Sequence, residues 1–484
     1  MQVRKRLDGE SRPGHNRSME LDTRAYDRAR LARDARFDGR FFIGVTSTGI
    51  YCRPVCPAPS PKASNVRYYP SAAAAAEAGF RPCLRCRPEA SPGTPAWLGA
   101  SASVSRALKL IAESALDDGG VEDLAGRLGL GSRHLRRLFL RYLGATPVAV
   151  AQTRRVHFAK KLIDETSLSM TQVALAAGFG SIRRFNAAFR KLYGRTPREL
   201  RLAAVRGRNG HAAGHYTFRL GYRPPYDWKS LIEFLGPRAT PGVETVSQDS
   251  YRRAISLDGR SGAIVVSPVA AKNHLELQVR FPDPAALFRI VERVRKIFDL
   301  GADPAEVAGH LKRDPRLKPM VNAHPGLRVP GCWDGFELAV RAILGQQVSV
   351  KAATTMAGRL AAEFGSKLPE GDGVLFPSAA TLRDADLTRI GVTKPRAASI
   401  RALAEAVARG EIVFDGSLDP EQFEQKITTL PGIGPWTAQY VAMRLGEPDA
   451  FPAGDLYLRD FARGSDAWRP WRAYAAMYLW KGQT

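Results

Sequence analysis

Four cysteines near the N-terminus are spaced like metal ligands. Three residues separate Cys52 from Cys56, two separate Cys83 from Cys86, and 26 residues lie between the pairs. Two such knuckles can offer four thiolates to one tetrahedral Zn²⁺ ion. Disulfides or buried thiols are the alternative use of these residues. Because the chain has only five cysteines in 484 residues, we expect one four-cysteine zinc site in a reducing compartment.

A second chemical group is a carboxylate that follows a glycine hairpin near the C-terminus. The hairpin, Pro431 to Gly434, joins a predicted helix at 420–429 to a predicted amphipathic helix at 436–445. Two closely spaced glycines let the backbone turn sharply and leave N–H groups free at a helix N-terminus, where they can bind phosphate. The turn that ends at Asp455 brings a carboxylate beside the hairpin. A plain connection between two helices is the alternative interpretation.

The stretch from Leu430 to Asp455 resembles the helix-hairpin-helix DNA glycosylase superfamily, and most closely its AlkA-like branch, the 3-methyladenine DNA glycosylases II. The resemblance implies that Asp455 is catalytic and that Gly432 and Gly434 hold the DNA backbone. Members that also cut the DNA strand carry a Lys where this chain has Trp436. The resemblance therefore implies a monofunctional glycosylase that hydrolyses the N-glycosidic bond of alkylated purines without a cofactor.

Aromatic residues match the base pocket of that family. Trp436 and Tyr440 lie four positions apart on one predicted helical face, and Trp480 comes close to the end of the chain. Phe234 also matches a pocket position, although an ordinary core phenylalanine is an equally good interpretation. An alkylated purine such as 3-methyladenine carries a positive charge, so electron-rich rings stacked on it would attract it.

Two departures from the AlkA-like pattern concern DNA entry and the C-terminus. The segment from Pro325 to Val350 resembles the part that enters the duplex, and its intercalating side chain falls on Gln347, where the family pattern has an apolar residue. Only 12 residues separate Asp455 from Trp468, where the pattern has another helix. This shortening is expected to trim the pocket floor or to destabilise the domain.

The cysteine segment resembles the N-terminal domain of Ada-type alkylation-response proteins. The flanking residues carry the resemblance, in DARFDGRFFIGVTSTGIYCRPVC and AGFRPCLRCRPE. It implies a structural zinc whose ligand Cys52 also accepts a methyl group from a DNA methyl phosphotriester, once per molecule. A zinc-bound thiolate stays deprotonated, and a methylated phosphate carries no charge that would repel it. A purely structural zinc module is the alternative.

Two helix-turn-helix patterns lie between these segments, at Val121 to Leu143 and at Met170 to Tyr193. Their repetition resembles the tandem DNA-binding domain of AraC-type regulators. The resemblance implies that helices beginning near Ser132 and Ser181 enter successive major grooves, with Arg183 and Arg184 able to reach bases or phosphates. RNA polymerase would be a partner if the chain activates transcription.

Charge is distributed unevenly along the chain. Residues 1–100 carry a net charge of +8 (17 basic and 9 acidic residues), and residues 101–210 carry +12 (20 and 8). The remaining 274 residues carry only +5 (35 and 30), within a total of +25. Two basic modules followed by a nearly balanced one favour double-stranded DNA as the partner, although a generally Arg-rich proteome would also raise the charge. No apolar run is long enough to span a membrane.

These signals predict a multidomain α+β protein. The expected parts are a disordered extension (1–18), a small zinc α/β domain (19–90), an all-α tandem helix-turn-helix domain (104–204), an antiparallel-sheet domain (215–300) and an all-α glycosylase domain (301–484), helical from Pro325 onward. We expect a cytoplasmic, nucleoid-associated monomer. The alternative function is a methylation-activated transcriptional regulator whose glycosylase domain is inactive, for which the shortened C-terminal segment is the best argument.

Overall fold

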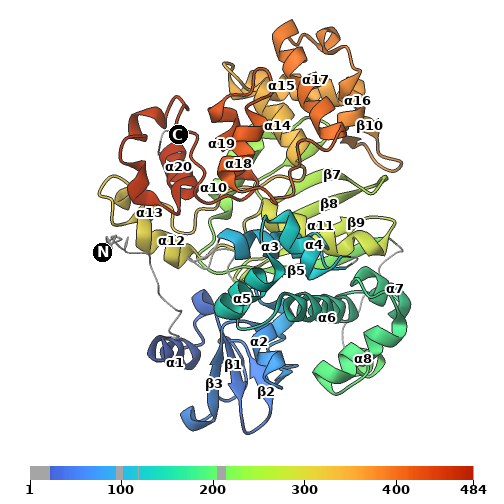
Figure 1. Cartoon of the computed structure of the whole chain (residues 1–484), viewed down its shortest axis with the longest axis vertical. Helices are drawn as coiled ribbons and strands as arrows, with labels where there is room; N and C mark the ends of the chain where they lie inside the picture. Colours follow the sequence, from blue (N-terminus) through green and yellow to red (C-terminus); the bar gives the residue numbers. More distant parts are fainter. Residues whose placement is uncertain (1–21, 94–101, 118, 204–213, 483–484) are drawn as a thin grey trace, which may run out of the picture.

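The computed structural model describes residues 22–93, 102–117, 119–203 and 214–482 (Figure 1). The extension expected at 1–18 lies outside the described residues. We call the four parts the cysteine unit (22–93), the helix-turn-helix unit (102–203), the sheet unit (214–300) and the helical unit (301–482). In Figure 1 the cysteine unit and most of the helical unit occupy opposite ends of the long axis. The sheet unit and the helices α3 to α5 lie between them, whereas α7 and α8 lie beside the cysteine unit.

The cysteine unit is a small sheet flanked by two helices. The strand order is β3-β1-β2-β4, with β1 antiparallel to β2 and β3, and β2 parallel to β4. The parallel pairing of β2 and β4 sets Tyr51 opposite Pro82. Cys52, the last residue of β2, and Cys83, which follows β4, therefore lie side by side. The elements are α1 (Thr23–Leu31), η1 (Ala35–Phe37), β1 (Phe42–Val45), β2 (Ile50–Cys52), η2 (Ala63–Asn65), β3 (Val66–Tyr69), α2 (Ala72–Glu77), β4 (Arg81–Pro82) and η3 (Pro88–Ala90).

The helix-turn-helix unit contains the repeat that the sequence predicts. In each copy a short helix is followed by a longer one that ends on a glycine in the left-handed conformation, Gly144 at φ 65° and Gly194 at φ 66°. The helix between the copies is the longest of this unit. The elements are α3 (Ala102–Ala112), α4 (Val121–Arg127), α5 (Ser132–Leu143), α6 (Pro147–Glu165), α7 (Met170–Ala176), α8 (Ile182–Tyr193) and α9 (Pro197–Ala203).

The sheet unit is a five-stranded antiparallel sheet of order β5-β9-β8-β7-β6. Its strands alternate buried and more exposed residues, as a sheet with one face packed on a core requires. The elements are β5 (His215–Gly221), α10 (Trp228–Leu235), η4 (Gly236–Arg238), β6 (Glu244–Val246), β7 (Tyr251–Leu257), β8 (Arg260–Pro268), β9 (His274–Arg280), η5 (Pro284–Ala286) and α11 (Leu287–Ile297).

The helical unit departs from the expected pattern, because the chain is not helical directly from Pro325, and α14 begins only at Gly335. A small hairpin of β10 and β11 follows α15, and Gly371 at φ 88° provides the turn that a periodicity argument does not detect. The elements are α12 (Pro304–Leu311), α13 (Lys318–Ala323), α14 (Gly335–Leu344), α15 (Val350–Phe364), β10 (Ser366–Lys367), β11 (Val374–Leu375), α16 (Ala379–Arg383), η6 (Leu387–Ile390), α17 (Lys394–Ala408), α18 (Pro420–Ile427), α19 (Pro435–Arg444), η7 (Arg459–Phe461), η8 (Ser465–Trp468) and α20 (Arg472–Lys481).

Polar contacts join the four units. Lys109 of α3 pairs with Glu447 after α19 at 2.7 Å, and Arg127 of α4 pairs with Asp415 before α18 at 2.9 Å. The Tyr51 hydroxyl and His157 Nε2 of α6 are hydrogen-bonded at 2.8 Å. The first helix-turn-helix copy therefore lies against the helical unit, and α6 lies against the cysteine unit. None of the helices described is long and apolar enough to cross a bilayer.

Candidate functional sites

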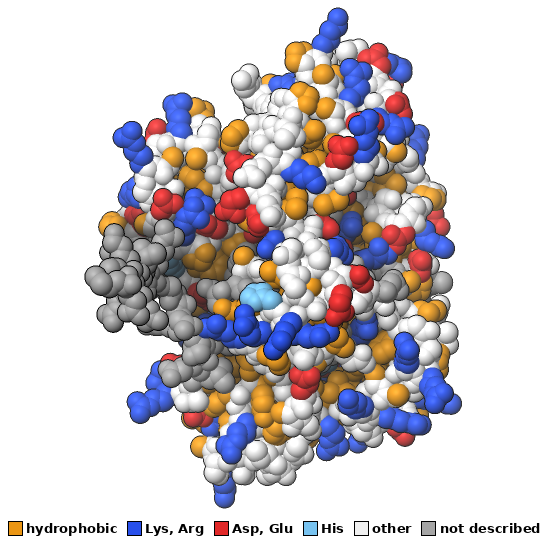
Figure 2. Space-filling model, in the orientation of Figure 1, with side chains coloured by type: hydrophobic (Ala, Val, Ile, Leu, Met, Phe, Trp, Pro, Cys, Tyr) orange, Lys and Arg blue, Asp and Glu red, His pale blue; other side chains and the backbone are white. Residues whose placement is uncertain are grey.

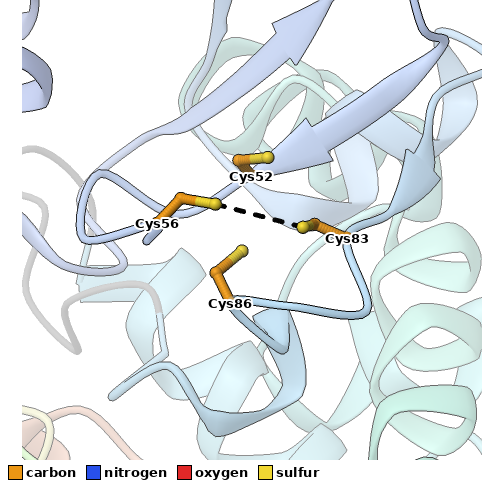
Figure 3. A group of neighbouring side chains, drawn as sticks. All are labelled: Cys52, Cys56, Cys83 and Cys86. Atoms are coloured by element: carbon orange, nitrogen blue, oxygen red, sulfur yellow. Dashed lines mark hydrogen bonds between the residues drawn. The ribbon is translucent and has the colours of Figure 1, made fainter. Parts of the chain in front are cut away.

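The four cysteine side chains of the predicted zinc site converge on one point (Figure 3). Their sulfur atoms all lie within 4.8 Å of one another, and the Sγ atoms of Cys56 and Cys83 are 4.0 Å apart. A disulfide requires about 2.05 Å. Tetrahedral Zn²⁺ with Zn–S bonds of about 2.3 Å requires sulfur separations of about 3.8 Å. The arrangement fits one zinc ion held by Cys52, Cys56, Cys83 and Cys86, and it excludes the disulfide alternative.

Arg53 ties the two cysteine pairs together. Its backbone N–H donates to Cys86 Sγ at 3.4 Å, and its guanidinium donates to the Cys86 carbonyl and to Asp38 Oδ1, both at 2.9 Å. Cys83 and Cys86 are buried, whereas Cys52 and Cys56 are half-buried. Cys52 and Cys56 are therefore the less enclosed of the four ligands. The fifth cysteine, Cys332, packs against the core of the helical unit, and burial raises the pKa of its thiol to about 12.

Asp455 is held by two tryptophan indoles. Trp480 Nε1 donates to Oδ1 at 3.0 Å, and Trp436 Nε1 donates to Oδ2 at 3.4 Å. The backbone N–H of Tyr457 also donates to Oδ1 at 3.0 Å. Trp436 belongs to the first turn of α19 and Trp480 to the last turn of α20. Donors on both oxygens fix the orientation of the carboxylate.

The four predicted pocket aromatics lie together around this carboxylate. Trp436 and Tyr440 are stacked, with ring centroids 5.5 Å apart. The Trp480 centroid lies 6.4 Å from that of Tyr440 and 6.2 Å from that of Phe234, which comes from α10 of the sheet unit. The pocket is thus built from three helices that are far apart in the sequence.

Two arginines of this pocket were missed by the sequence analysis. The Arg238 guanidinium lies 4.0 Å from the Phe234 ring centroid, and the Arg444 guanidinium lies 5.2 Å from it. Arg444 Nη1 also donates to the Tyr440 hydroxyl at 2.9 Å. Burial raises the pKa of Tyr440, but the nearby guanidinium groups outweigh burial and the pKa is lowered overall. The sequence signal that could have identified these arginines is their spacing, because Arg238 follows Phe234 and Arg444 follows Tyr440 by four residues.

The predicted phosphate-binding hairpin has the expected geometry. Gly432 adopts φ 73°, and Gly434 is the N-cap of α19. Within the described part of the chain, neither glycine N–H donates a hydrogen bond. Gln346 Nε2 donates to the Gly432 carbonyl at 2.8 Å and to Thr437 Oγ1 at 3.1 Å. The hairpin is therefore braced from the loop between α14 and α15, and its amides are available to a ligand.

Gln347, the residue predicted to enter the duplex, lies next to this brace. It is exposed and adopts φ 55°, which is uncommon for a residue other than glycine. Arg396 donates to the carbonyl of the preceding residue, Gln346, at 2.6 Å. The loop between α14 and α15 thus presents Gln347 outward from an anchored backbone.

The second recognition helix begins as expected. Ser181 caps α8 by accepting a hydrogen bond from the Arg184 N–H at 3.2 Å, and the side chains of Arg183 and Arg184 are exposed. The first recognition helix, α5, also carries a basic surface. Figure 2 shows Lys and Arg side chains in a band across the middle of one face, where Figure 1 places α5. The α5 arginines are Arg133, Arg136, Arg137 and Arg141.

The shortened segment after Asp455 is anchored to the rest of the helical unit. It contains two 3₁₀ turns, η7 and η8, in place of the helix of the family pattern. Trp468 is buried and its indole donates to Asp314 at 2.6 Å, which anchors the segment to the helical unit. This anchor lets α20 bring Trp480 to Asp455.

Four family models match the chain in succession. They are the metal binding domain of Ada at residues 25–89 and a helix-turn-helix domain at 124–203, followed by the AlkA N-terminal domain at 217–334 and the HhH-GPD superfamily base excision DNA repair protein at 340–478. The order is the one that the sequence motifs predict.

One curated relative matches nearly the whole chain, and two others match parts of it. The probable bifunctional transcriptional activator/DNA repair enzyme AlkA of Mycobacterium tuberculosis is 43% identical over 94% of this chain and 95% of its own length. DNA-3-methyladenine glycosylase 2 of Escherichia coli is 33% identical over 54% of this chain and 96% of its own length. The bifunctional transcriptional activator/DNA repair enzyme Ada of the same organism is 34% identical over 35% of this chain and 47% of its own length. The chain belongs to the family of bifunctional transcriptional activator/DNA repair proteins in which an Ada-type metal-binding domain and a helix-turn-helix domain precede an AlkA-type base excision domain.

Proposed function

We propose that the protein is a monofunctional DNA glycosylase that releases alkylated purines, of the 3-methyladenine type, from duplex DNA. The observation that carries this function is the Asp455 carboxylate, oriented by the indoles of Trp436 and Trp480 at the edge of an aromatic pocket. The free amides of the hairpin at Gly432 and Gly434 supply the adjacent backbone contact.

The residues divide the reaction between binding and hydrolysis. Because the glycosidic bond is shielded inside the duplex, the nucleotide must turn outward, and the hairpin amides hold the backbone while Gln347 fills the gap. The base stacks against the aromatic surface formed by Trp436, Tyr440 and Trp480. Asp455, on the sugar side, stabilises the developing positive charge of the sugar and orients the attacking water. The products are a free base and an abasic site. This protein carries Trp436 at the position where family members that also cut the strand carry a lysine.

The N-terminal half acts as a methyl acceptor. The Cys52 sulfur attacks the methyl carbon of a DNA methyl phosphotriester, the carbon–oxygen bond breaks, and the phosphate oxygen keeps the electron pair and becomes an ordinary diester anion. A zinc ion bound by Cys52, Cys56, Cys83 and Cys86 would keep the Cys52 thiolate deprotonated at neutral pH. The cysteine is consumed, so each molecule reacts once.

The helix-turn-helix unit binds promoter DNA, with Arg183 and Arg184 of α8 reaching bases or phosphates. Activation of transcription then requires contact with RNA polymerase. We propose a monomer that acts in the cytoplasm at the nucleoid, with domain boundaries at 19–90, 104–204, 215–300 and 301–484.

Two assays test these functions separately. Methylated duplex DNA incubated with the protein should release free 3-methyladenine and 7-methylguanine, and the strand should break only after alkali treatment of the abasic sites. Strand cleavage without alkali would contradict the monofunctional assignment. Duplex with a labelled methyl phosphotriester should transfer its label to a single cysteine, identified by peptide mapping as Cys52. Label on another residue would contradict its role.

A further inference from the structure

The groove beside Cys52 is bounded by two structural units. It has a volume of about 650 Å³ and is lined by the cysteine unit on one side and by Tyr193 and Arg195 on the other. Tyr193 is the last residue of α8, and α8 contacts β4, the strand that leads into Cys83. The second helix-turn-helix copy therefore forms part of the wall around the methyl acceptor.

The charged side chains that line the groove are all positive. Five arginines line it, and among its described lining residues there is no aspartate or glutamate; the arginines are Arg30, Arg53, Arg81, Arg85 and Arg195. Arg30 and Arg53 are paired with Asp27 and Asp38. The other three are exposed and form no ion pair within the described part of the chain. An anionic occupant such as a DNA backbone fits this surface.

The end of α8 holds Arg195 at the groove. Gly194 caps the helix at φ 66°, and a Cβ at this position would lie 3.5 Å from Arg81 Nη1, so the two units touch here. The nearby carboxylate of Glu199 is engaged in capping α9, where it accepts from the Thr196 N–H at 2.6 Å. Glu199 forms no ion pair with Arg195 within the described part of the chain, and Arg195 lines the groove.

Tyr193 contributes a packed ring to the wall of the groove. Its ring is buried and stacked on Phe189 at 5.5 Å, and its hydroxyl has no hydrogen-bond partner among the described residues. This hydroxyl is enclosed near Glu89 and Asp164, which do not line the groove. The wall formed by α8 therefore offers the groove the charge of Arg195.

We propose that Arg195 is a positioning residue for methyl transfer, binding a phosphate next to the methyl phosphotriester so that the second helix-turn-helix copy presents the lesion to Cys52. This inference rests on the proposed methyl-acceptor function. The methylated phosphate is uncharged, so electrostatic attraction to the groove must come from its charged neighbours in the same strand. Arginine suits this task because its guanidinium binds phosphate oxygens in pairs. The diester anion left after transfer lies among the same arginines.

The test compares charge-matched variants of the full-length, zinc-loaded protein. Arg195→Gln removes the charge at the groove, and Arg198→Gln removes one charge from an exposed position of α9 outside it. The substrate is a duplex with one labelled methyl phosphotriester, and methyl iodide serves as a methyl donor that carries no phosphate. We expect Arg195→Gln to slow transfer from DNA by about ten- to a hundred-fold, as loss of a charge-assisted hydrogen bond implies. Arg198→Gln should stay within about two-fold of the parent, and Arg195→Lys should recover part of the loss.

Methylation of Cys52 by methyl iodide, and the zinc content, should be the same in all variants. Equal rates of DNA methyl transfer for Arg195→Gln and Arg198→Gln would overturn the proposal. A parallel loss of methyl iodide reactivity or of zinc in Arg195→Gln would also overturn it, because the role would then be structural. If the parent protein reacts with methyl iodide but takes no methyl from the phosphotriester, the methyl-acceptor function itself fails.

Discussion

The indole Nε1 of Trp480 lies 3.0 Å from Oδ1 of Asp455, although the two residues are 25 positions apart. The contact joins the last turn of α20 to the turn that follows α19. Helix α20 therefore contributes directly to the site, because the Trp480 indole both donates to Asp455 and packs against Phe234. The shortened segment between them is therefore compatible with an oriented carboxylate.

Replacing Trp480 with Phe should separate packing from catalysis. The ring that stacks near Phe234 is kept, but the donor to Asp455 is lost. A hydrogen bond to a charged group contributes about 1.5–3 kcal/mol, so the single-turnover rate of base release should fall by about ten-fold or more. DNA affinity, measured by fluorescence anisotropy, should change little. Trp471→Phe is the matched control, because Trp471 is buried and contacts Tyr474 but not the carboxylate. Equal rates for the two variants would refute the role of the indole.

The two hairpin glycines should respond differently to alanine. At Gly432, φ is 73° and an added Cβ would lie 2.1 Å from Ser399 Oγ. Alanine there costs about 1–2 kcal/mol for the backbone conformation alone, and Ser399 must also move. At Gly434, an added Cβ meets no atom within 4 Å. Thermal unfolding should show a lower midpoint for Gly432→Ala than for Gly434→Ala, together with weaker DNA binding. Equal midpoints would contradict the geometry.

His157 should make stability depend on pH. Burial, assisted by Lys160, lowers the pKa of this histidine to about 4, whereas an unfolded histidine titrates near about 6.5. Between these values the unfolded chain binds the extra proton, so the free energy of unfolding falls as the pH falls, by about 3 kcal/mol in total. This contribution is fully present above about pH 6.5.

The matched variant for this prediction is His157→Gln, which does not titrate and can still bond the Tyr51 hydroxyl. Urea unfolding at pH 7, 6 and 5 should show a flatter pH profile for the variant than for the parent. Parallel profiles would show that His157 is not the group that titrates.

Local patterns in the sequence predicted most of the elements that build the sites. The spacing of Cys52, Cys56, Cys83 and Cys86 predicted their convergence, because metal ligands come in close pairs. The two glycines predicted the hairpin, and the helix predicted from residue 420 is α18, which begins at Pro420 with Asp419 as its N-cap. Each of these signals depends on residues that are close together in the sequence, so it can be recognised without knowledge of the tertiary structure.

Long-range pairings could not be predicted in this way. Lys109 and Glu447 meet although they are 338 positions apart, and neither belongs to a recognisable motif. Arg238 and Arg444 approach the same ring from different units, which depends on how α10 packs against α19. The hairpin of β10 and β11 has only two residues in each strand, too few for a hydrophobic period.

In the proposed mechanism, the carboxylate of Asp455 stabilises the charge that develops during hydrolysis. Asp455→Asn keeps the size of the side chain and one acceptor oxygen for the indoles, but removes the negative charge. Release of free 3-methyladenine from methylated duplex DNA should fall by at least about a hundred-fold, the usual effect of losing a group that stabilises transition-state charge. Binding of the same duplex should persist. Base release by Asp455→Asn at the rate of the parent protein would contradict the catalytic role of Asp455.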